Sequence, residues 1–159
     1  MTDILNIDHL SVTPNNASSR YLVKDVSFKL SAGKTTCIVG ESGSGKSLTA
    51  LSVMGLLSNQ LQAQGSIQFQ GQEITKLSSK ALQSIRGAKI GMIFQEPMTS
   101  LNPVLTIGYQ IGESLTAHLG LKGIALKDKI AALLTQVGIP PERAPIVTLM
   151  SFLAASANA

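Results

Sequence analysis

A glycine-rich loop constrains the fold of this chain more than any other stretch of its sequence. Residues 40–47 read G-E-S-G-S-G-K-S and satisfy the pattern G-x-x-x-x-G-K-[ST] at every fixed position. An apolar, β-rich run at 36–39 precedes the loop, and a helix-competent run at 47–54 follows it. The sequence therefore predicts a strand, a tight loop and a helix in that order.

The residue types in this loop suit the binding of an oligophosphate. Gly40, Gly43 and Gly45 lack a Cβ, so the backbone can adopt left-handed conformations and turn its N–H groups toward an anion. The amino end of the following helix also favours negative charge. We expect Lys46 to reach the β- and γ-phosphates and Ser47 to bind Mg²⁺. The predicted nucleotide-binding residues are Gly40, Glu41, Ser42, Gly43, Ser44, Gly45, Lys46, Ser47 and Thr49. The alternative is an ordinary Gly/Ser turn that precedes a lysine.

Composition narrows the class of protein. A chain of 159 residues with 44% hydrophobic residues is long enough for one domain with a real core. The net charge of +4 comes from scattered Lys and Arg residues without interleaved aromatics, which argues against nucleic-acid binding. Cys37 has no cysteine partner, and neither a signal pattern nor a membrane-spanning run is evident, so we expect a cytoplasmic location. Neither His9 nor His118 has a ligand or triad partner at a useful spacing.

The remaining segments predict an α/β chain. Alternating runs at 4–12 and 21–30 indicate a β-hairpin around a turn-rich break, and 65–72 and 89–94 read as further strands. Helices are expected at 46–57, at 78–86 with Ser78 or Ser79 as its cap and Gly87 as its stop, at 107–118 and at 127–137. Two prolines interrupt 95–103, which therefore cannot be a regular helix or a central strand.

These motifs together resemble the ATP-binding subunits of ABC transporters, in particular the oligopeptide, dipeptide and nickel uptake group. The resemblance rests on residues 40–47 and on M-I-F-Q-E-P-M-T-S-L-N-P at 92–103, and it runs from about residue 4 to Arg143. It implies a P-loop NTPase of ABC type, with an amino-terminal antiparallel β portion, a partial nucleotide-binding core and the start of a helical subdomain.

The resemblance assigns further roles. Gln95 matches the Q-loop glutamine, which contacts Mg²⁺ or the attacking water and counts as both a catalytic and a metal-binding residue, with Lys46 as the other catalytic residue. The alternative for Gln95 is an ordinary polar residue at a strand end. Residues 98–118 match the start of the helical subdomain that receives a permease helix. The aromatic residue that stacks on adenine in the family is replaced by Thr13-Pro14, and Tyr21 is the candidate substitute.

The family's remaining catalytic elements do not occur in the sequence. Residues 1–143 are expected to be a partial nucleotide-binding domain, and 144–159 a tail outside the family pattern. One permitted codon set for 147–159, read in a shifted frame, translates as Y-P-H-E-L-S-G-G-Q-R-Q-R, which resembles the family's signature region. We therefore expect a frameshift shortly after Arg143. The competing reading is a short membrane anchor or partner helix at 146–155.

The resemblance implies an ATP-binding subunit that energises the import of peptides or similar solutes by binding and hydrolysing ATP with Mg²⁺. Its implied partners are membrane permease subunits, a second ATP-binding subunit and, indirectly, a solute-binding protein, at the inner face of the membrane. The second hypothesis is a nucleotide-binding chain without turnover. An unrelated GTPase would need an N-K-x-D motif and a small kinase an arginine-rich lid, and the sequence has neither.

Overall fold

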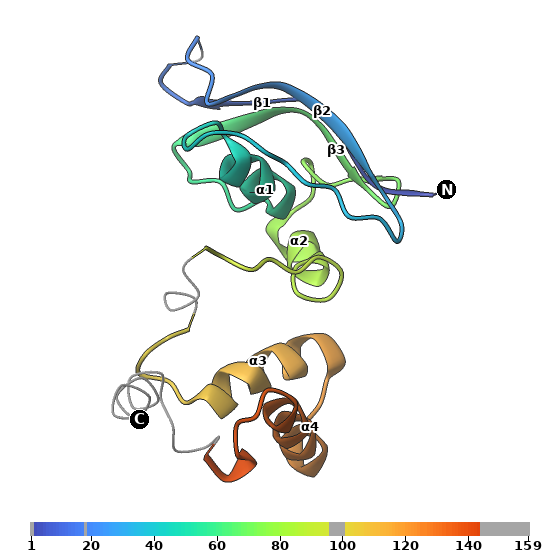
Figure 1. Cartoon of the computed structure of the whole chain (residues 1–159), viewed down its shortest axis with the longest axis vertical. Helices are drawn as coiled ribbons and strands as arrows, with labels where there is room; N and C mark the ends of the chain where they lie inside the picture. Colours follow the sequence, from blue (N-terminus) through green and yellow to red (C-terminus); the bar gives the residue numbers. More distant parts are fainter. Residues whose placement is uncertain (1, 18, 96–100, 144–159) are drawn as a thin grey trace. The chain divides into compact units, whose positions relative to one another are not determined.

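The computed structural model describes residues 2–17, 19–95 and 101–143, which belong to two compact units with their boundary in the chain between Arg86 and Gly87 (Figure 1). In the first unit the elements are β1 (Asp3–Pro14), β2 (Val23–Ser31), α1 (Lys46–Met54), β3 (Leu61–Phe69), β4 (Gln72–Glu73) and α2 (Ser79–Ile85). The second unit holds α3 (Ile107–Leu119), α4 (Gly123–Gln136) and the short 3₁₀ helix η2 (Pro141–Arg143).

An antiparallel sheet with strand order β2-β1-β3-β4 forms the first unit, which confirms the predicted hairpin and the amino-terminal antiparallel portion. The strand predicted at 65–72 begins earlier, as β3, and β1 continues through Pro14 into the predicted break. Helix α1 covers one face of the sheet (Figure 1). The most deeply buried apolar side chains of this unit come from β1 and β3: Ile7, Leu10, Val12 and Ile67.

A β-bulge in β1 lets both halves of this strand contribute to one core. Ile7 pairs with Ile67 and Asp8 with Ser66, but the next paired residues are Ser11 and Gln64, so two residues of β1 lie opposite Gly65. The extra residue changes the parity of the buried positions. Gly65 has φ +102, and a Cβ there would lie 2.4 Å from the His9 carbonyl oxygen, so only glycine fits opposite this bulge.

A second irregularity, in β2, faces the first. Asp25 has a left-handed backbone, φ 53, and its N–H donates to the Ser11 hydroxyl, while the His9 N–H donates to the Ser27 hydroxyl. His9 Nδ1 lies 2.6 Å from Asp25 Oδ1, so a polar pair joins the two irregular sites although 16 residues separate its members. This hydrogen bond, with the negative charges of Asp25 and Asp8, raises the pKa of His9 above 6.5, and burial opposes the rise.

Glu73 fixes the short strand β4 to β3. Its carboxylate accepts hydrogen bonds from the Ser66 hydroxyl, from the Ile67 N–H at 3.1 Å, and from the hydroxyl and N–H of Thr75. Burial alone would raise the pKa of Glu73, but these donors outweigh burial and lower the pKa to about 2. The carboxylate therefore stays charged and anchored through the whole neutral range.

Arg86 at the end of α2 holds the carboxyl end of α1. Its Nε donates to the Met54 carbonyl at 2.6 Å, and a terminal guanidinium nitrogen donates to the Gly55 carbonyl at 2.5 Å. These are carbonyls that a helix end leaves unsatisfied, and a cation there also matches the helix dipole. The Ser78 hydroxyl accepts from the Ala81 N–H, which confirms the predicted cap of α2. Helix α1 ends at Met54, short of the predicted 57, because Gly55 adopts a left-handed cap.

The two strands predicted at 36–39 and 89–94 are wrong. Residues 35–39 and 91–94 belong to no strand, and Val39 and Ile93 are 87% and 94% exposed. The free thiol of Cys37, expected inside the first of these strands, is exposed as well. A strand is stable only when a neighbour completes its hydrogen bonds. Apart from an isolated bridge at Ile90, no described strand pairs with either run. The residues of both runs favour a strand, but a strand also needs a partner segment, which lies elsewhere in the chain and cannot be predicted from the run itself.

Two helices form the second unit. Thr106 caps α3 by accepting from the Tyr109 N–H, and the Gln110 side chain donates to the Asn102 and Leu105 carbonyls, which fixes the preceding loop. Helix α4 starts four residues before the predicted 127, because Lys122 gives no side-chain cap and so no sequence signal. Gly112 of α3 faces Ile130 of α4, and a Cβ there would lie in ordinary van der Waals contact, 3.4 Å from the Ile130 Cδ1.

The close approach at the bulge gives a stability prediction. Gly65→Ala places a methyl group against the His9 carbonyl and forces a left-handed backbone on alanine. We expect a loss of about 2–4 kcal/mol in the free energy of unfolding, measured by urea denaturation. Gly71→Ala is the matched control, because its φ of +79 is also left-handed but nothing lies within 4 Å of the added Cβ. Equal losses in the two variants would contradict the contact argument.

The His9–Asp25 pair gives a pH prediction. Because the folded pKa of His9 is raised, its contribution to stability is fully present below pH 6.5 and is lost as pH rises through the folded value. The urea midpoint of the wild type should therefore exceed that of His9→Gln at pH 6 by more than it does at pH 8.5. Asp25→Asn should remove the same pH-dependent part. A wild-type advantage that is unchanged between the two pH values would show that protonated His9 contributes nothing.

Candidate functional site

The glycine-rich loop forms a turn whose own backbone holds the lysine side chain. The Lys46 ammonium donates to the carbonyls of Gly40 and Glu41, each at 2.7 Å, and lies 3.2 Å from the Ser44 hydroxyl. Lys46 thus curls over the loop and does not point away from it. An ammonium has three donors, so these three oxygens satisfy it in this structure, and an arriving phosphate oxygen would replace one of them.

Two glycines give the loop its shape. Gly43 and Gly45 have φ values of +81 and +91, the left-handed region that L-residues rarely adopt. Gly45 is the N-cap of α1, without a side-chain cap, so the first N–H groups of the helix remain available. The backbone conformation expected from the sequence at these two positions is confirmed.

The start of α1 rests directly on the sheet. A Cβ on Gly45 would lie 2.8 Å from the Val23 Cγ2 and 2.9 Å from the Leu22 carbonyl oxygen, so a side chain here would push the helix off β2. The Thr49 hydroxyl donates to the Gly45 carbonyl at 3.0 Å, and its side chain is buried between helix and sheet. The loop is therefore held at a fixed place against the first residues of β2.

A cleft of about 310 Å³ opens beside the loop. Two segments line it: residues 43–48 of the loop and the start of α1, and residues 20–22, namely Arg20, Tyr21 and Leu22. Two of these lining residues are cationic and none is acidic. Four of the predicted site residues, 40–42 and Thr49, do not line this cleft. The carbonyls of Gly40 and Glu41 instead accept hydrogen bonds from Lys46.

The place of Arg20, Tyr21 and Leu22 in this cleft was only partly expected from the sequence. Tyr21 was the candidate for a base contact, and the structure places it in the cleft with the loop. Arg20 carried no signal, because its place depends on how β2 meets α1. Gln95 is exposed and belongs to the second unit, and Glu96 lies outside the described residues. The metal and catalytic roles of Gln95 stay predictions.

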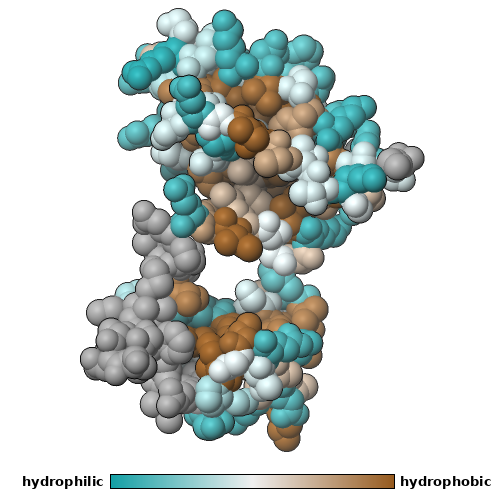
Figure 2. All heavy atoms as spheres, in the orientation of Figure 1, coloured by the Kyte–Doolittle hydropathy of each residue, from teal (hydrophilic) through white to brown (hydrophobic). Residues whose placement is uncertain are grey.

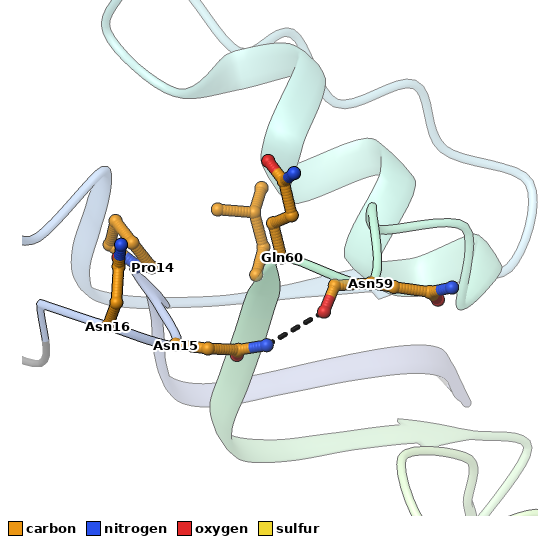
Figure 3. Close-up of a pocket in the computed structure, with 6 residues that line it drawn as sticks. Pro14, Asn15, Asn16, Asn59 and Gln60 are labelled. Atoms are coloured by element: carbon orange, nitrogen blue, oxygen red, sulfur yellow. Dashed lines mark hydrogen bonds between the residues drawn. The ribbon is translucent and has the colours of Figure 1, made fainter.

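A larger cleft of about 490 Å³ lies where β1 ends, and there the Asn15 amide donates to the Asn59 carbonyl at 2.7 Å (Figure 3). Asparagine, glutamine, proline and leucine line it, and it holds no charged side chain. Such a surface offers no charge complement to an anion, so the smaller cleft is the candidate site.

Comparison with known proteins relates the chain to one family. The family model described as ABC transporter matches residues 23–152. The dipeptide transport ATP-binding protein DppD of Bacillus subtilis is 43% identical over 143 residues, covering 88% of this chain and 43% of that protein. DppD of Escherichia coli is 41% identical over 140 residues, covering 86% and 42%. A putative peptide import ATP-binding protein of Brucella ovis is 44% identical over 148 residues, covering 88% and 44%.

Solved structures agree on the fold. A dimeric ATP-binding cassette in a post-hydrolysis state, bound to ADP and Pi, superposes with a TM-score of 0.71 at 22% identity, covering 89% of this chain and 60% of that one. The expected P-loop α/β fold class is thereby confirmed. The chain spans less than half the length of the DppD proteins and the Brucella protein. Within the described part, no helix has the length and apolar character needed to cross a bilayer.

Proposed function

Because the chain belongs to the ABC transporter family, we propose that it binds Mg-ATP in the cleft beside the glycine-rich loop and takes part in the ATP-driven import of peptides or similar small solutes. The single observation that carries the proposal is the arrangement of Lys46 and the free amino end of α1 around one cationic cleft. Relatives that are dipeptide and peptide import proteins by name support the solute class.

The chemistry of the cleft suits a chain of phosphates. The amides from Gly43 to Ser47 belong to a left-handed turn and a helix start, the two backbone arrangements that bind phosphate oxygens without a side chain. The Lys46 ammonium adds a full positive charge that a phosphate can share with the loop carbonyls. We propose that contacts to the β- and γ-phosphates contribute more to the binding free energy than the contact to the base.

The residues present fit a magnesium ion that arrives with the nucleotide. Ser47 lines the cleft with a hydroxyl, a hard oxygen ligand of the type that Mg²⁺ takes together with phosphate oxygens and water. Among the described residues no group of three His, Cys, Asp or Glu side chains could hold a metal by itself. We infer that the ion is held by Ser47 and the nucleotide. A metal-binding role for Gln95 rests on the family resemblance alone.

Tyr21 is the proposed contact of the base. Its ring is 49% exposed and lines the same cleft as the loop, while the Lys24 ammonium lies 5.6 Å from the ring centroid. A cation–π contact occupies one face of the ring and limits its rotation. The other face is then the one to stack on adenine, which supplies the aromatic surface missing at Thr13-Pro14.

Binding without turnover is the second candidate for this chain by itself. None of the described residues that line the cleft is acidic, so the cleft contains no carboxylate to position a water or to complete the shell of the metal. Positioning and charge stabilisation provide most of the catalysis of phosphoryl transfer. ATP hydrolysis is therefore proposed for the complete ABC assembly of two ATP-binding subunits.

The surface of the second unit supports a permease partner. Grooves of about 600 and 550 Å³ run between α3 and α4 and share Gly108, Tyr109 and Ile130. Tyr109 and Ile124 of this unit are 56% and 77% exposed, and Figure 2 shows hydrophobic residues at its surface. We propose that these helices receive a helix of the membrane subunits at the inner face of the membrane, with a solute-binding protein acting through the permease.

A binding measurement tests the proposed function. Isothermal titration of the purified chain with Mg-ATP should show one site, and Lys46→Ala should weaken binding about tenfold to a hundredfold because a charged hydrogen-bonding partner is lost. The matched control is Lys76→Ala, an exposed lysine of the same unit, which should bind as the wild type does. Phosphate release by the wild type should not exceed that of Lys46→Ala. Equal affinities in the wild type and Lys46→Ala would refute the proposed site.

The tail at 144–159 is proposed to be translated out of frame. The support is the shifted reading of 147–159, which gives a continuous run resembling the family's signature region. Sequencing the locus should reveal an open frame, shifted by one base, that continues this run, with permease and solute-binding genes nearby. A downstream sequence with no such frame would remove the frameshift proposal, and a locus without transport genes would remove the partner proposals.

A further inference from the structure

The cleft beside the glycine-rich loop has a cation that the loop motif does not supply. Arg20 lines this cleft together with Tyr21 and Leu22, and Lys46 and Ser47 line the same cleft. Both segments line one cleft of about 310 Å³, so a single ligand in it can contact residues of each. A ligand held by the loop therefore meets a guanidinium that comes from the segment before β2.

Backbone contacts hold the segment 20–22, which includes Arg20, next to the loop. The Arg20 N–H donates to the Ala17 carbonyl at 2.9 Å, and the Leu22 N–H donates to the Val12 carbonyl at 2.8 Å. On the other side, the Leu22 carbonyl oxygen would lie 2.9 Å from a Cβ on Gly45. Backbone contacts thus set the spacing between the Arg20 segment and the amino end of α1.

Arg20 is also the cation whose charge is least engaged in this cleft. The Lys46 ammonium is shared among three oxygens of its own loop, and the Lys24 ammonium lies over the ring of Tyr21. No ion pair joins Arg20 to a carboxylate of the described residues. A guanidinium presents a planar fork of donors that matches two phosphate oxygens, which an ammonium cannot do.

We propose that Arg20 is a phosphate-binding residue of this site, which binds the polyphosphate chain of the nucleotide together with Lys46 but from the segment before β2. This role rests on the proposed function, because it needs a nucleotide in the loop. Under this proposal the neighbouring side chains Arg20 and Tyr21 contact different parts of the ligand. Arg20 binds the phosphates, and Tyr21 stacks on the base.

Two probes separate these parts: Mg-ATP, and inorganic tripolyphosphate with Mg²⁺, which has the phosphates but no base. Titration calorimetry on the full chain should show that Arg20→Gln weakens binding of both probes by about tenfold, and that Arg20→Lys recovers part of the loss. Tyr21→Leu should weaken Mg-ATP and leave tripolyphosphate unchanged. Lys80→Gln, an exposed lysine of α2, loses the same charge elsewhere in the unit and should change neither.

The outcomes distinguish the possible failures. If the wild type binds both probes and Arg20→Gln binds tripolyphosphate as the wild type does, the assignment of Arg20 is overturned while the proposed function stands. If Lys80→Gln loses as much affinity as Arg20→Gln, the effect is that of net charge and the assignment is again overturned. If the folded wild type, checked by circular dichroism, binds neither probe, the proposed function and the inference fail together.

Discussion

The contact between Gly45 and the first residues of β2 is the constraint on which the site depends. Because Gly45 has no side chain, the amino end of α1 reaches the Leu22 carbonyl and the Val23 side chain directly. The left-handed backbone at the same residue ends the loop and leaves the first helical N–H groups without a cap. One residue thus leaves the helix amides uncapped and attaches them to the sheet, and Arg20 and Tyr21 line the same cleft as the loop.

The sheet into which the segment 20–22 leads is shaped by polar contacts at irregular positions in β1 and β2. The bulge opposite Gly65 keeps Ile7 and Leu10 in one core, and the His9–Asp25 pair joins it to the irregular site in β2. The segment from Arg20 to Leu22 leads directly into β2. The geometry of the cleft therefore depends on the register of a hairpin as well as on the loop motif, and changes far from the loop can alter ligand binding.

Features encoded within a few residues were predictable, and features that need distant partners were not. The glycine-rich loop, the cap of α2 at Ser78 and the helix starting near 107 follow local rules, and the structure confirms them. The runs at 36–39 and 89–94 have strand propensity but no described partner strand, so the prediction failed there. The early start of α4 was missed because Lys122 provides no cap, and Arg20 was missed because only packing brings it to the loop.

The central claim is that the backbone from Gly43 to Ser47 surrounds the phosphates of a nucleotide. The most direct measurement is a ¹⁵N-resolved NMR titration of the full chain with Mg-ATP, which reports each backbone amide separately. The account predicts the largest shifts at the amides of Gly43 to Ser47, with smaller shifts at Arg20 and Tyr21. Shifts confined to other parts of the chain, with the loop amides unmoved at saturation, would contradict it.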